Sequence, residues 1–329
     1  MVKQRSDIIK ISVLLISSVL IALLLLEVAL RAVGYSYSPL RIVANSNDAR
    51  FKHSYQDRHF VYDPDLIWRP KKSRVFNAQG YLGKELSVNK SGNEYRIFAI
   101  GDSNTLGWYG QDSWALYLQE LVTNRDKAVY VINAGVYGYT SYQGEKRFEE
   151  TLALKPDMVL ICFGANDQHM VAVSDADFNR TVLSTYKRLL YKFKVGQVLI
   201  AFLETFVEKR ESTKDQLVHR VSIEEYKKNL IRIIEVSKKN NITCVLLTRP
   251  VLGESADKLS WKHYAPDYRE ATIAVAGDYN VPVIDLYSYF KDQDQYFMDD
   301  GHFNEKGHRL AAKVIYDQIQ PLLTGSGSK

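Results

Sequence analysis

Two short polar segments, far apart in the chain, carry residue types that could together perform nucleophilic catalysis. Ser103 lies within Gly101-Asp102-Ser103-Asn104-Thr105, directly after the apolar run 95–100, and His302 stands three residues after Asp299. A neutral serine hydroxyl is a weak nucleophile, so it requires a base within hydrogen-bond reach and a third group that orients the base. Ser103, His302 and Asp299 have the chemistry for these roles, and the sequence predicts a divided catalytic triad.

Two further polar blocks lie between these segments, and each follows its own apolar run. Asn133-Ala134-Gly135 follows the run 129–132, and Gly164-Ala165-Asn166-Asp167 follows the run 158–163. A tetrahedral intermediate requires donors aimed at its oxyanion. A glycine lets a backbone N–H approach closely, and an asparagine side chain provides a second donor. We therefore expect both blocks to supply donors to one site.

In order along the chain, the four blocks follow the patterns GDSxT, NxGxxG, GxND and DxxHxN. This ordered set resembles the SGNH (GDSL-type) hydrolases, and the resemblance covers roughly residues 95–323. Residues 62–70 and 77–81 are similar to the leader of the membrane-anchored members of this family. No block departs from the family pattern. By position, the resemblance implies Ser103 as the nucleophile, His302 as the base, Asp299 as its orienting acid, and the N–H of Ser103 with Gly135 and Asn166 as the oxyanion hole.

Neighbouring residues offer alternatives for some of these roles. Asp300 is a second candidate for the triad carboxylate, whereas we expect Asp102 to make structural hydrogen bonds beside the nucleophile. His308, six residues after His302, is expected to be a surface or capping residue. Both histidines with Asp299 and Asp300 could form a metal site, but no cysteine or second histidine stands at ligand spacing. We expect neither a metal nor a cofactor.

Aromatic residues flank the serine and glycine blocks. Sugars present apolar C–H faces that stack on aromatic rings, so these residues could line a glycan groove. Ordinary packing is the alternative, because a buried Tyr or Trp needs only one polar partner. The candidates for substrate lining are Trp108, Tyr109, Tyr137 and Tyr139, with Tyr142 nearby.

Residues 8–33 are apolar enough and long enough for one membrane span, with Glu27 as an acidic interruption near the end. Glu27 and Arg31 are four residues apart on one helical face and can pair. We expect an uncleaved anchor; a cleaved signal peptide and a buried core helix are the alternatives. Basic residues flank the uncharged run 11–26 on both sides, so the charge asymmetry is not decisive, although the excess before the run is typical of a cytoplasmic N-terminus. These residues are Lys3, Arg5 and Lys10 before the run, and Arg31 and Arg41 after it.

The rest of the chain divides into two parts that differ in composition and in the pattern of apolar residues. Residues 35–94 are rich in proline and polar residues and are expected to be irregular, with one hairpin, and to pack beside the catalytic unit as a spacer from the membrane. From residue 95, fully apolar runs alternate with amphipathic ones, which favours a parallel sheet covered on both faces. We expect the following divisions: 1–34, cytoplasmic N-terminus and transmembrane anchor; 35–94, juxtamembrane leader; 95–323, catalytic domain; 324–329, flexible tail.

The alternation predicts a three-layer α/β/α, flavodoxin-like fold with strand order 2-1-3-4-5. All four polar blocks then lie just past the carboxyl ends of strands. Residues 195–210 are ambiguous, because residues 198–203 could form an extra strand or belong to an insertion over the active-site face. The expected strands are 95–100, 128–133, 158–163, 242–248 and 281–285, and the expected helices are 114–123, 142–154, 177–191, 223–240, 267–279 and 306–323.

The charge and cysteine composition limits which binding partners and which cysteine chemistry are expected. The net charge of +5, with no long basic tract, gives no indication of nucleic-acid binding. Cys162 and Cys244 fall inside expected strands and are interpreted as core residues, with a disulfide or a reactive thiol as the alternative.

The residues and the resemblance together predict a membrane-anchored serine esterase with its catalytic domain outside the cytoplasm. Its expected substrates are O-acyl esters, above all O-acetyl esters, of an envelope or exported glycan. An O-acetyltransferase with the same triad, working with a membrane-bound acyltransferase partner, is the alternative. A lipid or thioester substrate also stays open, as does an anchored glycan-binding protein without catalysis.

Overall fold

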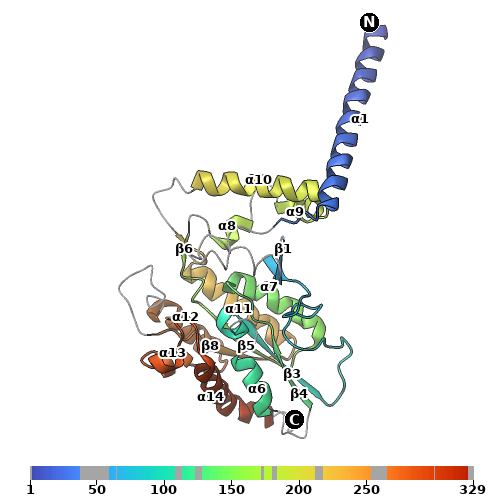
Figure 1. The fold of residues 1–329 in the computed structure, drawn as a ribbon. Helices are drawn as coiled ribbons and strands as arrows, with labels where there is room; N and C mark the ends of the chain where they lie inside the picture. Colours follow the sequence, from blue (N-terminus) through green and yellow to red (C-terminus); the bar gives the residue numbers. More distant parts are fainter. Residues whose placement is uncertain are drawn as a thin grey trace.

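The computed structural model describes residues 2–37, 59–63, 65–107, 113–122, 128–171, 174–179, 184–211, 218–252, 265–299 and 301–324. A five-stranded parallel sheet forms its centre (Figure 1). The lateral order β4-β3-β5-β8-β9 confirms the predicted order 2-1-3-4-5. The strands are β3 (Glu94–Gly101), β4 (Ala128–Asn133), β5 (Met158–Phe163), β8 (Thr243–Thr248) and β9 (Val283–Ile284).

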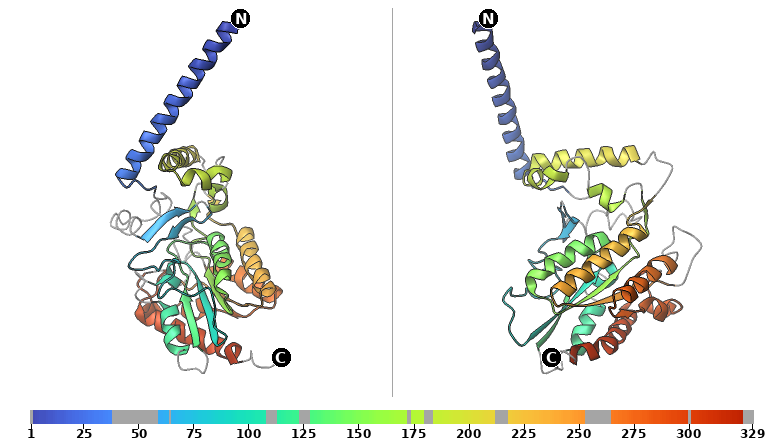
Figure 2. Two further views of the ribbon diagram at one scale, coloured as in Figure 1. Left: turned by 90° about the vertical axis from the view of Figure 1, so that its right-hand side faces the viewer. Right: turned by 180° about the vertical axis from the view of Figure 1, so that it is seen from behind.

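Helices cover both faces of this sheet, so the predicted three-layer architecture is confirmed (Figure 2). Every residue of β5 is buried, as expected for a strand with helices on both sides. One face packs against α7 (Ser141–Thr151), α11 (Ile223–Lys239) and α12 (Ala265–Asp278). The other packs against α6 (Trp114–Val122), α13 (Leu286–Phe290) and α14 (Glu305–Thr324).

Between β5 and α11 the chain makes an excursion that the sequence predicted only in part. The expected helix 177–191 is two helices, α8 (Asp175–Asn179) and α9 (Ser184–Tyr191), separated by residues outside the described part. The ambiguous stretch is helix α10 (Lys194–Glu211), so the extra strand was wrong. A short apolar run does not distinguish a strand from a helix by itself. A two-residue antiparallel pair, β6 (Met170–Val171) with β7 (Val218–His219), closes the base of the excursion.

The leader packs on the domain, as expected, and contains the expected hairpin. Strands β1 (Phe60–Asp63) and β2 (Ile67–Pro70) pair antiparallel. Trp68, Phe76 and Tyr81 are buried in the hydrophobic core that the sheet forms with α7, α11 and α12. The described residues 59–63 and 65–94 therefore share a core with the sheet, while residues 38–58 and 64 lie outside the described part.

Helix α1 (Val2–Ala32) projects away from the rest of the protein (Figures 1 and 2). The most apolar window of its segment Asp7–Ala32 has a mean hydropathy of 2.8, and none of that window is buried. Twenty-six residues of helix are long enough to cross the apolar core of a bilayer. This exposure excludes the buried core helix, and the expected pair forms, with 2.7 Å between Arg31 and Glu27.

Two helical glycines give a matched test of how tightly the layers pack. At Gly144 of α7 a Cβ would lie 2.2 Å from the ring of Phe163 in β5, whereas at Gly277 of α12 it would meet nothing within 4 Å. We expect Gly144→Ala to lower the free energy of unfolding by about 1–3 kcal/mol through overpacking. Gly277→Ala should raise it by up to about 1 kcal/mol, because alanine favours the helix. Denaturant unfolding in detergent measures both, and equal effects would contradict the packing argument.

Candidate active site

The structure brings together the three residues of the predicted triad. Ser103 Oγ lies 2.8 Å from His302 Nε2, and His302 Nδ1 lies 3.0 and 2.9 Å from the two carboxylate oxygens of Asp299. These are hydrogen-bond distances at which a proton can pass from a hydroxyl to an imidazole. Ser103 begins the short helix α5 (Ser103–Leu106) directly after β3, and His302 lies in the loop before α14. Asp300 lies outside the described residues.

The carboxylate of Asp299 is suited to orienting the imidazole. It also accepts hydrogen bonds from the N–H groups of Gly301 and His302, both at 2.8 Å. Partial burial raises its pKa, but the hydrogen bond and charge of His302, with these backbone donors, bring the pKa down to about 2. Asp299 is therefore ionised near neutral pH, accepts the Nδ1 proton and leaves Nε2 to accept a proton from Ser103.

A buried ion pair holds the serine turn in place. Asp102 caps α5 by accepting the N–H of Asn104 at 2.9 Å, as expected for a structural residue, and it also pairs with Arg249 at 2.8 Å. Arg249 donates a second hydrogen bond, of 2.7 Å, to the carbonyl oxygen of Gly301. The guanidinium thus joins the serine turn to the histidine loop. The sequence analysis missed Arg249, although a cation directly after a largely apolar strand was a signal that could have identified it.

His308 corrects a sequence-based expectation. It is buried, and its Nδ1 accepts the N–H of Trp114, the first residue of α6, at 3.2 Å. Burial, with the charges of His302 and Arg249, lowers its pKa to about 3, so the ring is neutral and able to accept. The capping role is present, but on another helix, and the surface position was wrong because α14 packs against α6 across this residue.

The residues expected to form the oxyanion hole lie around α5. The Ser103 N–H belongs to the first turn of α5, where helix geometry provides no intrahelical acceptor. At Gly135 a Cβ would lie 2.4 Å from the backbone nitrogen of Leu106, so only glycine allows this approach. The Asn166 amide donates to the carbonyl of Tyr139 at 2.9 Å and lies 3.5 Å from Asp102. The Gly135 N–H donates to Asn133 at 2.9 Å, so an oxyanion would share this donor.

Polar side chains of the middle blocks fix these backbone positions. The buried Asn133 amide donates to the carbonyl of Thr105 at 2.8 Å and to Ser113 Oγ at 2.9 Å. Asp167 accepts the N–H groups of Ser141 at 2.8 Å and Gly164 at 3.0 Å. Each block therefore ties the end of one strand to a neighbouring turn.

The expected substrate-lining aromatics divide into three groups. Trp108 and Tyr109 lie outside the described residues. Tyr137 is half-buried and keeps this role as a prediction. Tyr139 is fully buried and its hydroxyl donates to the carbonyl of Trp68 at 2.6 Å, so lining by Tyr139 was wrong. Its ring instead packs edge-on against Trp68 of the leader, a contact that local sequence could not reveal.

Cys162 and Cys244 are free and buried, which confirms their interpretation as core residues. Within the described ranges, no cluster of three or more His, Cys, Asp or Glu side chains could hold a metal ion.

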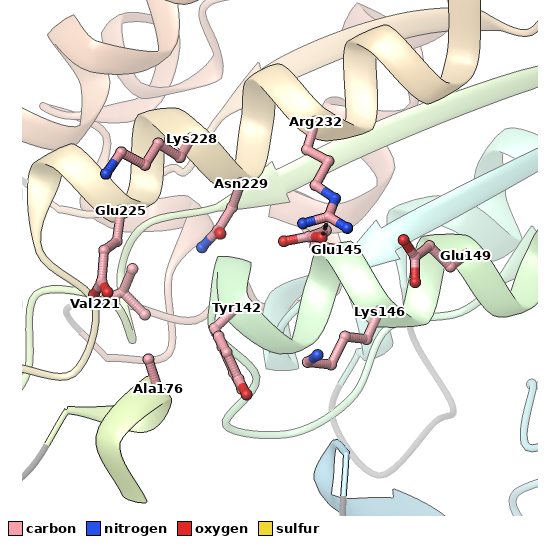
Figure 3. A pocket seen from close by; sticks show the side chains of 10 residues that line it. All are labelled: Tyr142, Glu145, Lys146, Glu149, Ala176, Val221, Glu225, Lys228, Asn229 and Arg232. Carbon is pink, nitrogen blue, oxygen red and sulfur yellow. Dashed lines mark ion pairs between the residues drawn. The ribbon is translucent and has the colours of Figure 1, made fainter. Parts of the chain in front are cut away.

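A cavity of about 450 Å³ lies apart from the triad, between α7 and α11 (Figure 3). Its walls carry charges of both signs, including the ion pair between Arg232 and Glu145 at 2.9 Å. None of the triad residues lines it. The lining residues are Tyr142, Glu145, Lys146, Glu149, Ala176, Val221, Glu225, Lys228, Asn229 and Arg232.

Comparison with known proteins identifies relatives across this region. Residues 99–310 match the model of the GDSL-like lipase/acylhydrolase family. The uncharacterized lipoprotein YqeF of Bacillus subtilis (strain 168) is 24% identical over 238 residues, which cover 68% of this chain and 87% of the relative. A GDSL-like lipase from Bacteroides thetaiotaomicron has a TM-score of 0.46 and 16% identity, covering 72% of this chain and 93% of that one. An acetyl-xylooligosaccharide esterase from Geobacillus stearothermophilus has a TM-score of 0.47 and 19% identity, covering 71% and 96%.

Replacing the carboxylate that contacts His302 tests its assignment against its neighbour. Asp299→Asn should lower kcat for a chromogenic acetate ester about 100-fold to 10,000-fold, because an amide favours the wrong imidazole tautomer. Asp300→Asn is the matched control and should retain most activity. The reverse ranking would make Asp300 the triad carboxylate.

The same pair predicts a dependence of stability on pH. Because the folded-state pKa of Asp299 is lowered to about 2, its stabilising contribution is present above about pH 4 and is lost as the pH falls towards 2. The difference in unfolding free energy between wild type and Asp299→Asn should shrink over that interval. A difference that stayed constant would show that the carboxylate is not stabilised by this pairing.

Arg249→Met should destabilise the protein strongly, because it leaves the buried carboxylate of Asp102 without its cation. The expected loss in unfolding free energy is about 3–5 kcal/mol. Arg309→Met removes a guanidinium from an exposed pair with Glu305, 2.9 Å apart, and should leave the unfolding free energy nearly unchanged, because solvent screens an exposed pair. Similar losses for the two variants, measured by denaturant unfolding, would contradict a structural role for the buried pair.

Proposed function

The chain belongs to the GDSL-like lipase/acylhydrolase family and is a serine ester hydrolase; from that premise we propose that Ser103, His302 and Asp299 are its catalytic triad. The observation that carries this proposal is the continuous hydrogen-bonded series from Ser103 Oγ through His302 to Asp299. Ser103 attacks the ester carbonyl while His302 Nε2 takes its proton. His302 then returns the proton to the leaving alcohol, and water discharges the acyl-enzyme by the same steps.

We further propose that Gly135, Asn166 and the N–H of Ser103 stabilise the oxyanion. The support is their common position beside α5, with Gly135 packed on Leu106 and Asn166 next to Asp102. Donors fixed before the reaction stabilise the charge that develops on the carbonyl oxygen without reorganising.

We propose that α1 is an uncleaved anchor and that the catalytic domain lies outside the cytoplasm. Besides the length of the span, the support is that the end of α1 belongs to the folded protein. Val195 N–H donates to Glu27 at 2.9 Å, and Arg31 donates to the carbonyl of Lys192 at 3.3 Å. Cleavage after this helix would remove both contacts. The proposed divisions are 1–34 for the N-terminus and anchor, 35–94 for the leader, 95–323 for the catalytic domain and 324–329 for the tail.

We propose O-acetyl esters of an envelope or exported glycan as the substrate. The rim of the site leaves room for a bulky alcohol, since the Asp299 side chain is 53% exposed and Met298 beside it is exposed as well. Tyr137, half-buried in the glycine block, offers a ring against which a sugar could stack.

The full-length protein in detergent, assayed on acetylated glycans and on chromogenic esters of increasing chain length, tests this proposal. We expect release of acetate from the glycans and the highest kcat/KM on the acetate ester. Ser103→Ala should reduce both by about 1,000-fold or more with an unchanged circular dichroism spectrum.

Three outcomes would contradict parts of the proposal. Activity retained in Ser103→Ala would mean that another residue is the nucleophile. A preference for long acyl chains or thioesters would exclude the acetylated glycan. Faster transfer of acetate to an unacetylated glycan than to water would identify an O-acetyltransferase.

A further inference from the structure

Helices α9 and α10 form a platform at the foot of α1. Figure 1 shows α10 lying across the end of α1, between that helix and the sheet. The contacts are specific, because Glu27 accepts the N–H of Val195 at 2.9 Å and Arg31 reaches the carbonyl of Lys192. Glu27 and Arg31 are also the charged residues at which the apolar run of α1 ends. The platform is therefore fixed at the level where the expected membrane span ends.

One side of the platform is buried against the chain that leaves α1. Ile200 packs with Tyr37, whose N–H donates to the side chain of Gln197 at 3.2 Å. A Cβ at Gly196 would lie 1.9 Å from the carbonyl oxygen of Leu190, so α9 and α10 approach each other closely. These contacts fix which side of α10 faces outward.

The platform exposes a group of large apolar side chains. Beyond residue 33, the described part of the chain exposes eleven large hydrophobic side chains, and six of them lie between residues 186 and 202. Such a concentration on one short stretch marks an interaction surface rather than scattered surface residues. These six residues, here called the platform face, are Tyr186, Leu189, Phe193, Val198, Leu199 and Phe202.

We propose that the platform face lies in the lipid–water interface of the membrane that α1 spans. The inference rests on the proposed anchoring by α1. Its basis is continuity, because the platform face adjoins the end of an apolar helix to which α10 is hydrogen-bonded. The apolar part of α10, Lys194–Leu203, is too short to cross a bilayer. A helix with one apolar side at this depth buries that side at the boundary of head groups and acyl chains.

Because the platform belongs to the excursion between β5 and α11, its contact with the membrane has a consequence for the active site. The excursion carrying the platform leaves the sheet after β5 and returns before α11, so both connections lie at the carboxyl edge that carries Ser103 and Asn166. Seated in the interface, the platform would hold this edge in a set orientation to the membrane surface. A substrate displayed at that surface would then meet the site without a search by a freely rotating domain.

Depth-dependent fluorescence quenching on the full chain tests the proposal. Both native cysteines are buried, so a fluorophore can be attached to a single cysteine introduced at Phe202. The protein is reconstituted in phosphatidylcholine–phosphatidylglycerol vesicles that carry a nitroxide either high or deep on the acyl chain. Leu20→Cys in α1 reports the anchor. Val88→Cys is the matched control, since Val88 is 57% and Phe202 58% exposed, but Val88 precedes β3 at the amino edge of the sheet.

We expect the shallow nitroxide to quench Phe202→Cys several-fold more than Val88→Cys, and the deep one to quench Leu20→Cys. Quenching at Leu20 with Phe202 no different from Val88 would overturn the platform inference and leave the anchor standing. Absence of quenching at Leu20 would overturn the anchor itself. Protection of Phe202 from both the lipid nitroxides and an aqueous quencher would mean that protein, such as a second copy of the chain, covers the platform face.

Glutamate at the same position gives a second measurement. Phe202→Glu should reduce quenching of a label at Leu199→Cys several-fold, because a carboxylate opposes insertion. Val88→Glu should leave that quenching unchanged. Equal effects of the two substitutions would also overturn the inference.

Discussion

A single buried guanidinium connects the two halves of the active site. Arg249 pairs with Asp102 under the serine turn and donates to Gly301 in the histidine loop. Burying such charges is costly, and a well-packed apolar substitute often gives equal or greater stability. The arrangement is therefore better explained by position than by stability. It sets the separation between two segments that lie at opposite ends of the domain's sequence, and the 2.8 Å between Ser103 and His302 depends on that separation.

The strand order explains why the remaining groups converge. β3 lies between β4 and β5, so the residues following these three strands meet at one edge. Ser103, Gly135 and Asn166 each follow one of them. In an open parallel sheet this carboxyl edge is where ligands bind, because the loops there leave a crevice. Short polar ties, such as Asn133 to Thr105, convert this neighbourhood into fixed geometry.

The sheet, its strand order and the proximity of the triad residues could be predicted from the sequence, because each of these depends on local periodicity and on motifs at strand ends. Properties that depend on a distant partner could not be predicted. From local sequence His308 looks like a surface residue, but in the fold α6 packs over it. Tyr139 likewise looks like a residue that lines a groove, but Trp68 of the leader covers it. Likewise, the apolar run within α10 fits a strand as well as a helix, and only its packing on α9 and α1 decides between them.

The leader affects which part of the chain folds as one cooperative unit. The family match begins at residue 99, yet Trp68, Phe76 and Tyr81 occupy the same hydrophobic core as the sheet. A chain cut at the edge of the family match would lose three large aromatic side chains from that core. The segment between anchor and sheet is thus no passive tether in its described part: residues 59–94 and the sheet should melt in one cooperative transition. Inheritance of this enzyme as an intact module would then require the leader and the hydrolase region to be kept together.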